Sequence, residues 1–185
     1  MTTPMAERPT VSIRFSAAEI GTRVEEMAVE LAEKLPPDTL VVSVLKGSFV
    51  FAADLIRALS HAGANWSMDF LTLSSYGTGT KSSGHVRIVR DIVDDVRGRD
   101  VLLVDDILES GLTLSFAKNL LKERGAHRVW VCTLLDKPHK RRAELEADFT
   151  GFRAGDEFLV GYGLDWAHRF RGLPYIGVVE KTAAE

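Results

Sequence analysis

The chain has 185 residues, with 23 Lys and Arg against 26 Asp and Glu, a formal net charge of −3, and 45% hydrophobic residues. This length and composition predict one globular domain with its own core, and they exclude intrinsic disorder as a class. The balanced charge argues against a general nucleic-acid binder, and the single cysteine, Cys132, excludes a disulfide framework and a Cys-rich zinc site.

The N-terminal segment lacks the apolar stretch of a signal peptide, and we expect residues 1–10 to be a disordered lead-in. No apolar run is long enough to span a membrane. With one cysteine, a reducing and therefore cytoplasmic location is the simplest interpretation. Residues 11–185 are expected to form a single domain.

Helices and strands are expected to alternate along the first half of the chain. Apolar residues at roughly helical spacing predict a helix over 17–35, which Ser16 and Glu19 would cap together in a capping box. After Pro36 and Pro37, an apolar run predicts a buried strand over 40–45. The next expected elements are a helix over 49–61 ended by Gly63, a strand over 66–73, a loop over 74–84 and a half-exposed strand over 85–92.

The second half begins with an acidic turn over 93–100, followed by the strongest signal for a buried strand, at 101–104. The remaining expected elements are a helix over 112–124 closed by Gly125 and strands over 128–135, 158–160 and 175–179. This alternation predicts an α/β fold with a mainly parallel sheet. Ligands bind at the carboxyl ends of the strands in such sheets, so the site is expected there.

A chemical signal follows the strand expected over 101–104. Asp105 and Asp106 come first, then a short loop with Ser110, Gly111 and Thr113 that leads into a helix. Amides at the start of a helix bind phosphate, and a glycine lets the backbone approach an anion closely. Because the two carboxylates would repel phosphate, they must face something else, and vicinal sugar hydroxyls fit because they donate hydrogen bonds. The pattern favours a phosphorylated ribose, although an isolated Asp-Asp pair is more often a plain strand end.

The pattern over 101–113 resembles the phosphoribosyl-pyrophosphate signature of the type I phosphoribosyltransferases. From about residue 11 to 180, the chain resembles the hypoxanthine (hypoxanthine-guanine) phosphoribosyltransferases. The resemblance implies a Rossmann-like, twisted, mainly parallel sheet flanked by helices, with a small hood built from the N-terminal segment and residues 150–185. It also implies a purine salvage enzyme that transfers the phosphoribosyl group from phosphoribosyl pyrophosphate to N9 of hypoxanthine, and of guanine, releasing pyrophosphate.

The resemblance assigns roles to the matching residues. Lys46 and Gly47, in the loop after the strand over 40–45, would bind pyrophosphate together with Arg171, and the Lys-Gly peptide can be cis in the family. Ser75 and Tyr76 would be the contacting pair of a mobile lid. The ribose and its phosphate would be bound by Asp105, Asp106, Ile107, Leu108, Ser110, Gly111, Leu112 and Thr113.

A second group of matching residues implies purine recognition. Lys137 would donate to the 6-oxygen of the base, which selects hypoxanthine or guanine over adenine because adenine carries an amino donor there. Phe158 would stack on the purine, and the backbone of Leu159 would bond to its edge. The basic run Lys140 to Arg142 is followed by acidic residues, and we expect a solvated surface there.

Magnesium is the cofactor that the resemblance implies. Asp165 would hold a second ion partly through water, and Asp105 and Asp106 would lie near the first through the ribose. Position 109 departs from the family, where an Asp contacts purine N7 as the proposed general base or acid; here it is Glu109. A glutamate has similar intrinsic acidity, so the same proton transfer is expected with a slightly shifted loop or base. Asp105 stands where the family often has Glu.

Two other function classes share part of the pattern. Pyrimidine regulators that bind RNA, and uracil phosphoribosyltransferases, have a similar acidic motif, but the regulators lack the Gly-Tyr-Gly-Leu-Asp-Trp stretch of residues 161–166. A signalling receiver domain also ends a strand on an acidic pair, but on its first strand. We expect phosphoribosyl pyrophosphate and a 6-oxopurine as substrates, no nucleic-acid or membrane partner, and a homodimer or homotetramer. The preference among hypoxanthine, guanine and xanthine stays open.

Overall fold

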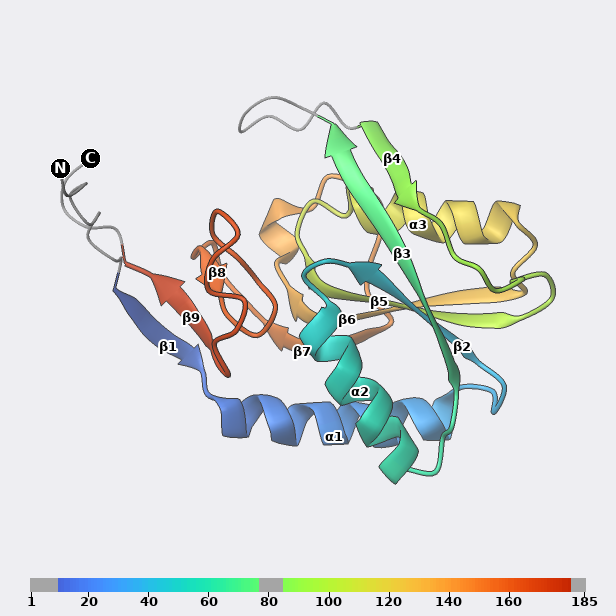
Figure 1. Cartoon of the computed structure of the whole chain (residues 1–185), viewed down its shortest axis with the longest axis horizontal. Helices are drawn as coiled ribbons and strands as arrows, with labels where there is room; N and C mark the ends of the chain where they lie inside the picture. Colours follow the sequence, from blue (N-terminus) through green and yellow to red (C-terminus); the bar gives the residue numbers. More distant parts are fainter. Residues whose placement is uncertain (1–9, 77–84, 181–185) are drawn as a thin grey trace, which may run out of the picture.

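The computed structural model describes residues 10–76 and 85–180. A six-stranded sheet has helices on both faces, and a separate three-stranded sheet lies beside it (Figure 1). The strands of the large sheet, in spatial order, are β4 (His85–Arg90), β3 (Ser67–Tyr76), β2 (Leu40–Leu45), β5 (Asp100–Leu108), β6 (Arg128–Asp136) and β7 (Phe149–Arg153). All neighbours in it are parallel except β3 and β4. This arrangement confirms the expected α/β fold.

The small sheet joins the two ends of the described chain. Its order is β1 (Val11–Phe15), β9 (Ile176–Val179) and β8 (Leu159–Val160), and both pairings are antiparallel. The helices are α1 (Ala17–Lys34), α2 (Phe49–His61), α3 (Leu112–Glu123) and the short 3-10 helix η1 (Pro138–Lys140). No helix within the described residues is long and apolar enough to cross a membrane.

Helix α1 begins at the predicted capping box. The hydroxyl of Ser16 accepts from the Glu19 backbone amide, and the Glu19 carboxylate accepts from the Ser16 amide at 2.8 Å. Without these bonds, the backbone amides of Ser16 and Glu19 would lack hydrogen-bond partners at the start of the helix. The helix ends at Lys34, with Leu35 as its C-cap immediately before Pro36, and its apolar face is buried against α2 and the sheet.

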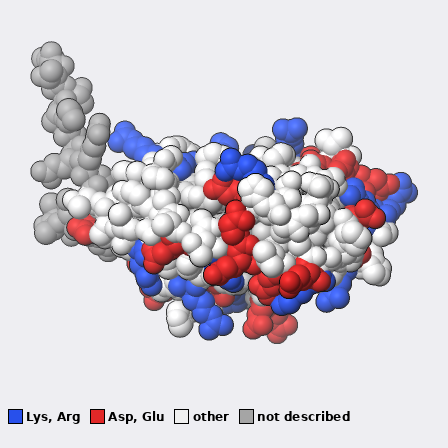
Figure 2. Space-filling view, turned by 90° about the horizontal axis from the view of Figure 1, so that it is seen from below, with Lys and Arg blue, Asp and Glu red and all other residues white. Residues whose placement is uncertain are grey.

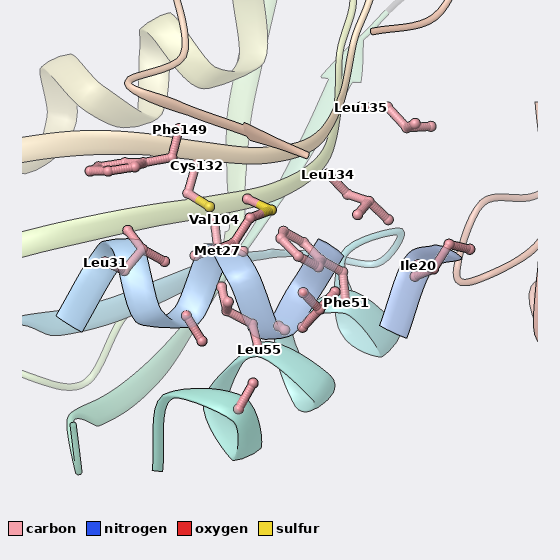
Figure 3. Packing of buried hydrophobic residues seen from close by; sticks show 14 of the residues in the cluster. Ile20, Met27, Leu31, Phe51, Leu55, Val104, Cys132, Leu134, Leu135 and Phe149 are labelled. Carbon is pink, nitrogen blue, oxygen red and sulfur yellow. The ribbon is translucent and has the colours of Figure 1, made fainter. Parts of the chain in front are cut away.

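The core has two parts, one on each face of the large sheet. Successive side chains of a strand point to opposite faces, so Leu102 and Val104 of β5 pack with α1 and α2, whereas Val101 and Leu103 pack with α3. Figure 3 shows the first part, in which Cys132 lies among apolar side chains above α1. Burial raises the pKa of the Cys132 thiol, so this cysteine is a packing residue, as expected, and not a nucleophile.

Several strands differ from their predicted bounds. Strand β3 continues to Tyr76, into the expected loop, because β4 pairs with it antiparallel. Strand β5 continues to Leu108, so the acidic pair lies within the strand and not after it. Strands β1 and β7 were not expected. The lead-in up to residue 9 and the lid segment over 77–84 lie outside the described residues.

Candidate functional site

The matching residues meet at the carboxyl edge of the large sheet. Lys46 and Gly47 follow β2, the acidic motif ends β5, and Lys137 follows β6. These three strands are neighbours and parallel, so their carboxyl ends lie together. This is the edge at which open α/β sheets bind ligands.

At this edge Asp105 is buried and Asp106 is partly buried. Asp105 is 9% exposed and accepts a hydrogen bond of 2.9 Å from the backbone amide of Asp106. Asp106 accepts in the same way from the amide of Ile107, at 2.9 Å. Burial first, and the charge of Asp106 second, raise the pKa of Asp105, and burial also raises the pKa of Asp106. Hydrogen bonds from the hydroxyls of a ligand would stabilise the ionised form of these two carboxyl groups.

A hollow follows the aspartate pair, where β5 leads into α3. Its volume is about 260 Å³, and it is lined by residues 105–111, Thr113 and Leu114. Gly111 has a φ of 77°, in the left-handed region that glycine adopts without strain, and it precedes the first residue of α3. The first amides of α3 therefore border the hollow, which suits it to a phosphate group.

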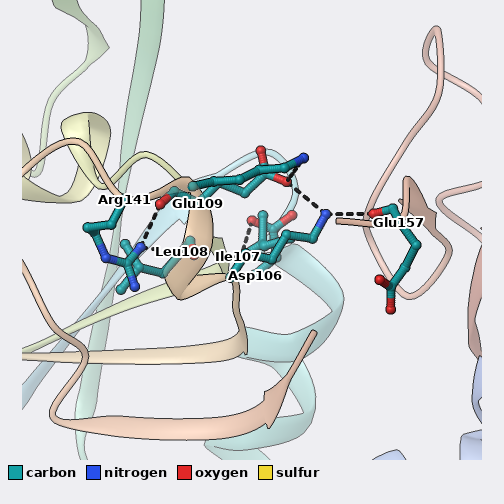
Figure 4. A network of polar contacts seen from close by, with 8 residues as sticks. Asp106, Ile107, Leu108, Glu109, Arg141 and Glu157 are labelled. Carbon is teal, nitrogen blue, oxygen red and sulfur yellow. Dashed lines mark hydrogen bonds and ion pairs between the residues drawn. The ribbon is translucent and has the colours of Figure 1, made fainter. Parts of the chain in front are cut away.

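Lys137 and Glu109 form an ion pair at the rim of this hollow. The Lys137 side chain is 3% exposed, and its Nζ lies 2.9 Å from Glu109 Oε1 and 2.7 Å from the carbonyl oxygen of Glu157 (Figure 4). Glu109 is 42% exposed, so its carboxylate remains open to a ligand. A lysine donor and a carboxylate acceptor thus lie side by side, which suits a ligand edge with an acceptor next to a donor.

The loop after β2 packs tightly against Asp106, and the segment after β8 packs tightly against that loop. A Cβ atom at Gly47 would overlap the carboxylate of Asp106, and one at Gly163 would overlap the carbonyl oxygen of Gly47. Gly163 also has a φ of 101°. Only glycine fits either place, and the two glycines join the loop after β2 to the segment after β8. The cis peptide bond is Leu45–Lys46, not the Lys46–Gly47 bond that the resemblance suggested.

Asp165 and Arg171 lie in the segment that follows β8. Arg171 Nη2 is 2.6 Å from Asp165 Oδ1, and Nη1 donates to the carbonyl of Gly163 at 2.6 Å. The backbone between them has positive φ at Ala167, His168 and Phe170, a strained conformation that tends to occur at functional sites. Among the described residues, no group of three or more potential ligands could hold a metal alone. A metal at Asp165 would therefore need oxygens from a ligand or from water.

The remaining predicted residues are placed as follows. Phe158 is 54% exposed, with a free ring face, whereas Leu159 is buried in β8. Phe158 directly follows Glu157, whose carbonyl accepts from Lys137 Nζ, so the backbone that carries the ring lies beside the lysine. Ser75 and Tyr76 are backbone members of β3, in register with β4.

The expectation of a solvated surface is wrong for Arg141. Lys140 and Arg142 are exposed, but the Arg141 side chain is only 16% exposed. Its Nη1 donates to the carbonyls of Leu108 at 3.1 Å and Glu109 at 2.6 Å. The sequence offered no signal for this role, because three consecutive basic residues look alike.

Comparisons with known proteins agree with this geometry. Residues 16–166 match the family model described as the phosphoribosyl transferase domain. The hypoxanthine-guanine phosphoribosyltransferase of Bacillus subtilis is 46% identical, over 94% of this chain and 95% of that protein. The hypoxanthine phosphoribosyltransferase of Escherichia coli is 43% identical, over 92% of this chain and 96% of the relative. The crystal structure of a hypoxanthine phosphoribosyltransferase from Staphylococcus aureus superposes with a TM-score of 0.86 at 39% identity, over 91% of each chain.

Proposed function

Because the chain belongs to the phosphoribosyltransferase family, as a hypoxanthine phosphoribosyltransferase of purine salvage, we propose that the carboxyl edge of the large sheet binds both substrates, with the phosphate of the ribose in the hollow at the end of β5. The reaction transfers the phosphoribosyl group from phosphoribosyl pyrophosphate to N9 of hypoxanthine and releases pyrophosphate; guanine is the second substrate. The observation that carries the proposal is the Lys137–Glu109 pair at the rim of the hollow. A 6-oxopurine presents an acceptor at O6 next to a proton at N7, which complements that pair.

The phosphoribosyl half of the site is built on β5 and α3. Asp105 and Asp106 accept hydrogen bonds from the ribose hydroxyls, which offsets the cost of burying the Asp105 carboxylate. Ser110 and Thr113, with the amides around Gly111, bind the phosphate of the ribose at the start of α3. Ile107 and Leu108 contribute backbone at the same hollow, and Leu112 contributes its amide as the first residue of α3.

The pyrophosphate lies between the loop after β2 and the segment after β8. Lys46 and Gly47 bind it from one side, and Arg171 from the other. The tight packing of Gly47 against Asp106 supports this arrangement, because it brings that loop to the ribose hydroxyls. Cationic groups here stabilise the charge that develops on pyrophosphate as it leaves, which is electrostatic catalysis.

The purine lies over Lys137 and Glu109. Lys137 donates to O6, Glu109 takes the N7 proton, Phe158 stacks on the ring and the Leu159 backbone bonds to its edge. The half-exposed ring of Phe158 supports stacking, since a buried ring would have no free face. Glu109 is within reach of this proton because its carboxylate already contacts the lysine that binds O6. Holding both substrates in one site also lowers the reaction barrier, because it positions N9 of the purine against the ribose carbon that it attacks.

The donors present fit magnesium that binds together with pyrophosphate. Magnesium takes oxygen ligands, keeps several waters and is often held by one or two carboxylates plus substrate phosphates. Asp165 would supply such a carboxylate, and Asp105 and Asp106 would lie near a further ion through the ribose. When bound, magnesium neutralises charge on the leaving pyrophosphate. Arg171, now paired with Asp165, would turn its charge to the pyrophosphate.

We assign the hood to the small sheet of β1, β9 and β8 and the segment between β8 and β9, since Asp165 lies in that segment and Phe158 directly precedes β8. A lid with Ser75 and Tyr76, a homodimer or homotetramer, and a cytoplasmic location stay predictions.

The alternative of an RNA-binding pyrimidine regulator is not favoured by the named relatives. On the face in Figure 2, acidic side chains gather across the middle and basic ones are scattered around them. This face offers no continuous basic surface for RNA.

The test is steady-state transfer with hypoxanthine, guanine, xanthine, adenine and uracil, with and without a magnesium chelator, and an RNA-shift assay in parallel. We expect turnover of hypoxanthine and guanine, none of uracil, and recovery of activity on adding magnesium back. Turnover of uracil alone, or RNA binding without purine turnover, would overturn the proposal in favour of the regulator.

A further inference from the structure

Arg141 lies outside the residues to which the proposed function gives a role, yet it contacts the backbone of the acidic motif. Its guanidinium donates from Nη1 to the carbonyls of Leu108 and Glu109 (Figure 4). Its Nη2 pairs with the carboxylate of Asp136. Both partners of this ion pair are largely buried, with side-chain exposures of 16% and 14%. A planar guanidinium can make these contacts at once, because its donors point in fixed directions.

Neighbouring backbone contacts extend the attachment. The amides of Arg142 and Ala143 donate to the carbonyl of Ser110 at 2.9 and 3.0 Å. The amide of Lys137 donates to the carbonyl of Leu108 at 2.9 Å. The segment from 137 to 143 is therefore bonded to the loop from 108 to 110 along its length.

Arg141 holds the backbone of Glu109 just beyond the end of β5. Leu108 is the last residue of β5, so the sheet no longer fixes the backbone beyond it. The carbonyl of Glu109 is held by Arg141, and the direction of the Glu109 carboxylate depends on that backbone. Asp136 ends β6 and precedes Lys137, so the same guanidinium also joins the strand that carries the lysine.

We propose that Arg141 is a positioning residue that fixes Glu109 relative to Lys137 and holds the loop over 109–113 in shape to bind phosphate. The inference rests on the proposed function for what the positioned groups do, but the positioning itself is a property of the unliganded protein. Arg141 need not touch either substrate.

The experiment compares Arg141→Met, Arg141→Lys and the matched control Arg142→Met, whose side chain is exposed. In Arg141→Met we expect kcat with hypoxanthine to fall on the order of ten- to a hundredfold, because misplacement of a reacting group acts on the transition state. The KM for hypoxanthine should change much less, since Lys137 and Phe158 remain. Arg141→Lys should recover only part of kcat, because an ammonium cannot reproduce the planar set of bonds.

A second readout is independent of turnover. Hydrogen exchange of the amides over 109–113 in the unliganded protein should accelerate about tenfold or more in Arg141→Met and stay unchanged in Arg142→Met. If Arg141→Met does not fold, the inference is tested on Arg141→Lys, with kcat and hydrogen exchange as the two measurements. Wild-type kcat and exchange in the variant that folds would overturn the inference. A different result would separate the two claims. If the wild-type protein turns over no purine, but exchange is still faster in the Arg141 variant than in the wild type, the proposed function is overturned and the positioning role stands.

Discussion

The Nζ atom of Lys137 lies 2.9 Å from Oε1 of Glu109, and the lysine of this pair is buried while the glutamate is not. The lysine is thus shielded from solvent, and the pair lies at the rim of the hollow. In the proposed complex, a 6-oxopurine replaces this contact with two contacts of its own, one to each side chain.

Replacing Lys137 by Met should weaken discrimination between purines. Loss of a charged hydrogen bond to O6 costs about 2 kcal/mol, so kcat/KM for hypoxanthine should fall about 30-fold, whereas the low value for adenine should change little. The measurement is the ratio of the two kcat/KM values. Lys140→Met is the control, because Lys140 is exposed and 3.8 Å from Glu109. An unchanged ratio in Lys137→Met would remove this lysine from purine selection.

Replacing Asp105 by Asn should stabilise the fold while lowering activity. Burial raises the pKa of Asp105 in the folded protein above its unfolded value, so the ionised form disfavours folding. This penalty is absent below the unfolded pKa, near pH 4, grows as the pH rises toward the folded pKa, and persists above it.

Denaturant unfolding of both proteins at pH 4 and at pH 7.5 checks the expectation for Asp105. We expect similar stabilities at the lower pH and an advantage of about 1–3 kcal/mol for Asp105→Asn at the higher pH. Asn can still accept from the Asp106 amide, so that bond is kept. A less stable variant at pH 7.5 would contradict the assigned cause of the pKa shift.

Replacing Gly47 by Ala should damage the site. The added methyl would overlap the Asp106 carboxylate, so the loop after β2 or the aspartate must move, and kcat/KM should fall on the order of a hundredfold. Gly21→Ala is the control: its Cβ meets nothing within 4 Å in α1, so activity should stay and stability should rise by about 0.5–1 kcal/mol. Equal activity in the two variants would argue against close packing at Gly47.

Replacing Asp165 by Asn should change the response to magnesium. A neutral amide binds the ion less tightly than a carboxylate, so half-maximal activity should require about tenfold more magnesium, with a smaller change at saturation. Asp156→Asn is the control, since Asp156 is exposed on the preceding segment. A magnesium titration identical to wild type would exclude Asp165 as a ligand.

The gathering of the site could be predicted from the sequence because it follows from one rule. Lys46, the acidic motif and Lys137 each come directly after a predicted parallel strand, and parallel strands end at one edge. Both ends of α1 were predictable from local sequence, because Ser16 and Glu19 determine its start and Pro36 its end.

The missed strands depend on partners far away in the chain. Strand β1 pairs with β9, more than 160 residues later, and β7 carries a glycine in the middle of five residues. Strand β1 does alternate apolar and polar residues, but over five residues only, whereas β7 shows no such alternation. Arg141 is the same kind of case: its role appears only when β5 and β6 bring the carbonyl of Glu109 beside it.

The central claim is that Glu109, with Lys137, handles the reacting edge of the purine although the family usually has Asp there. The most direct measurement is steady-state kcat/KM for hypoxanthine in Glu109→Ala and Glu109→Asp, with the exposed Glu144→Ala as control. We predict a loss of about 10²–10⁴-fold in the alanine variant, the usual contribution of a general acid or base, and retention of most activity in the aspartate variant. Full activity in Glu109→Ala would contradict the claim.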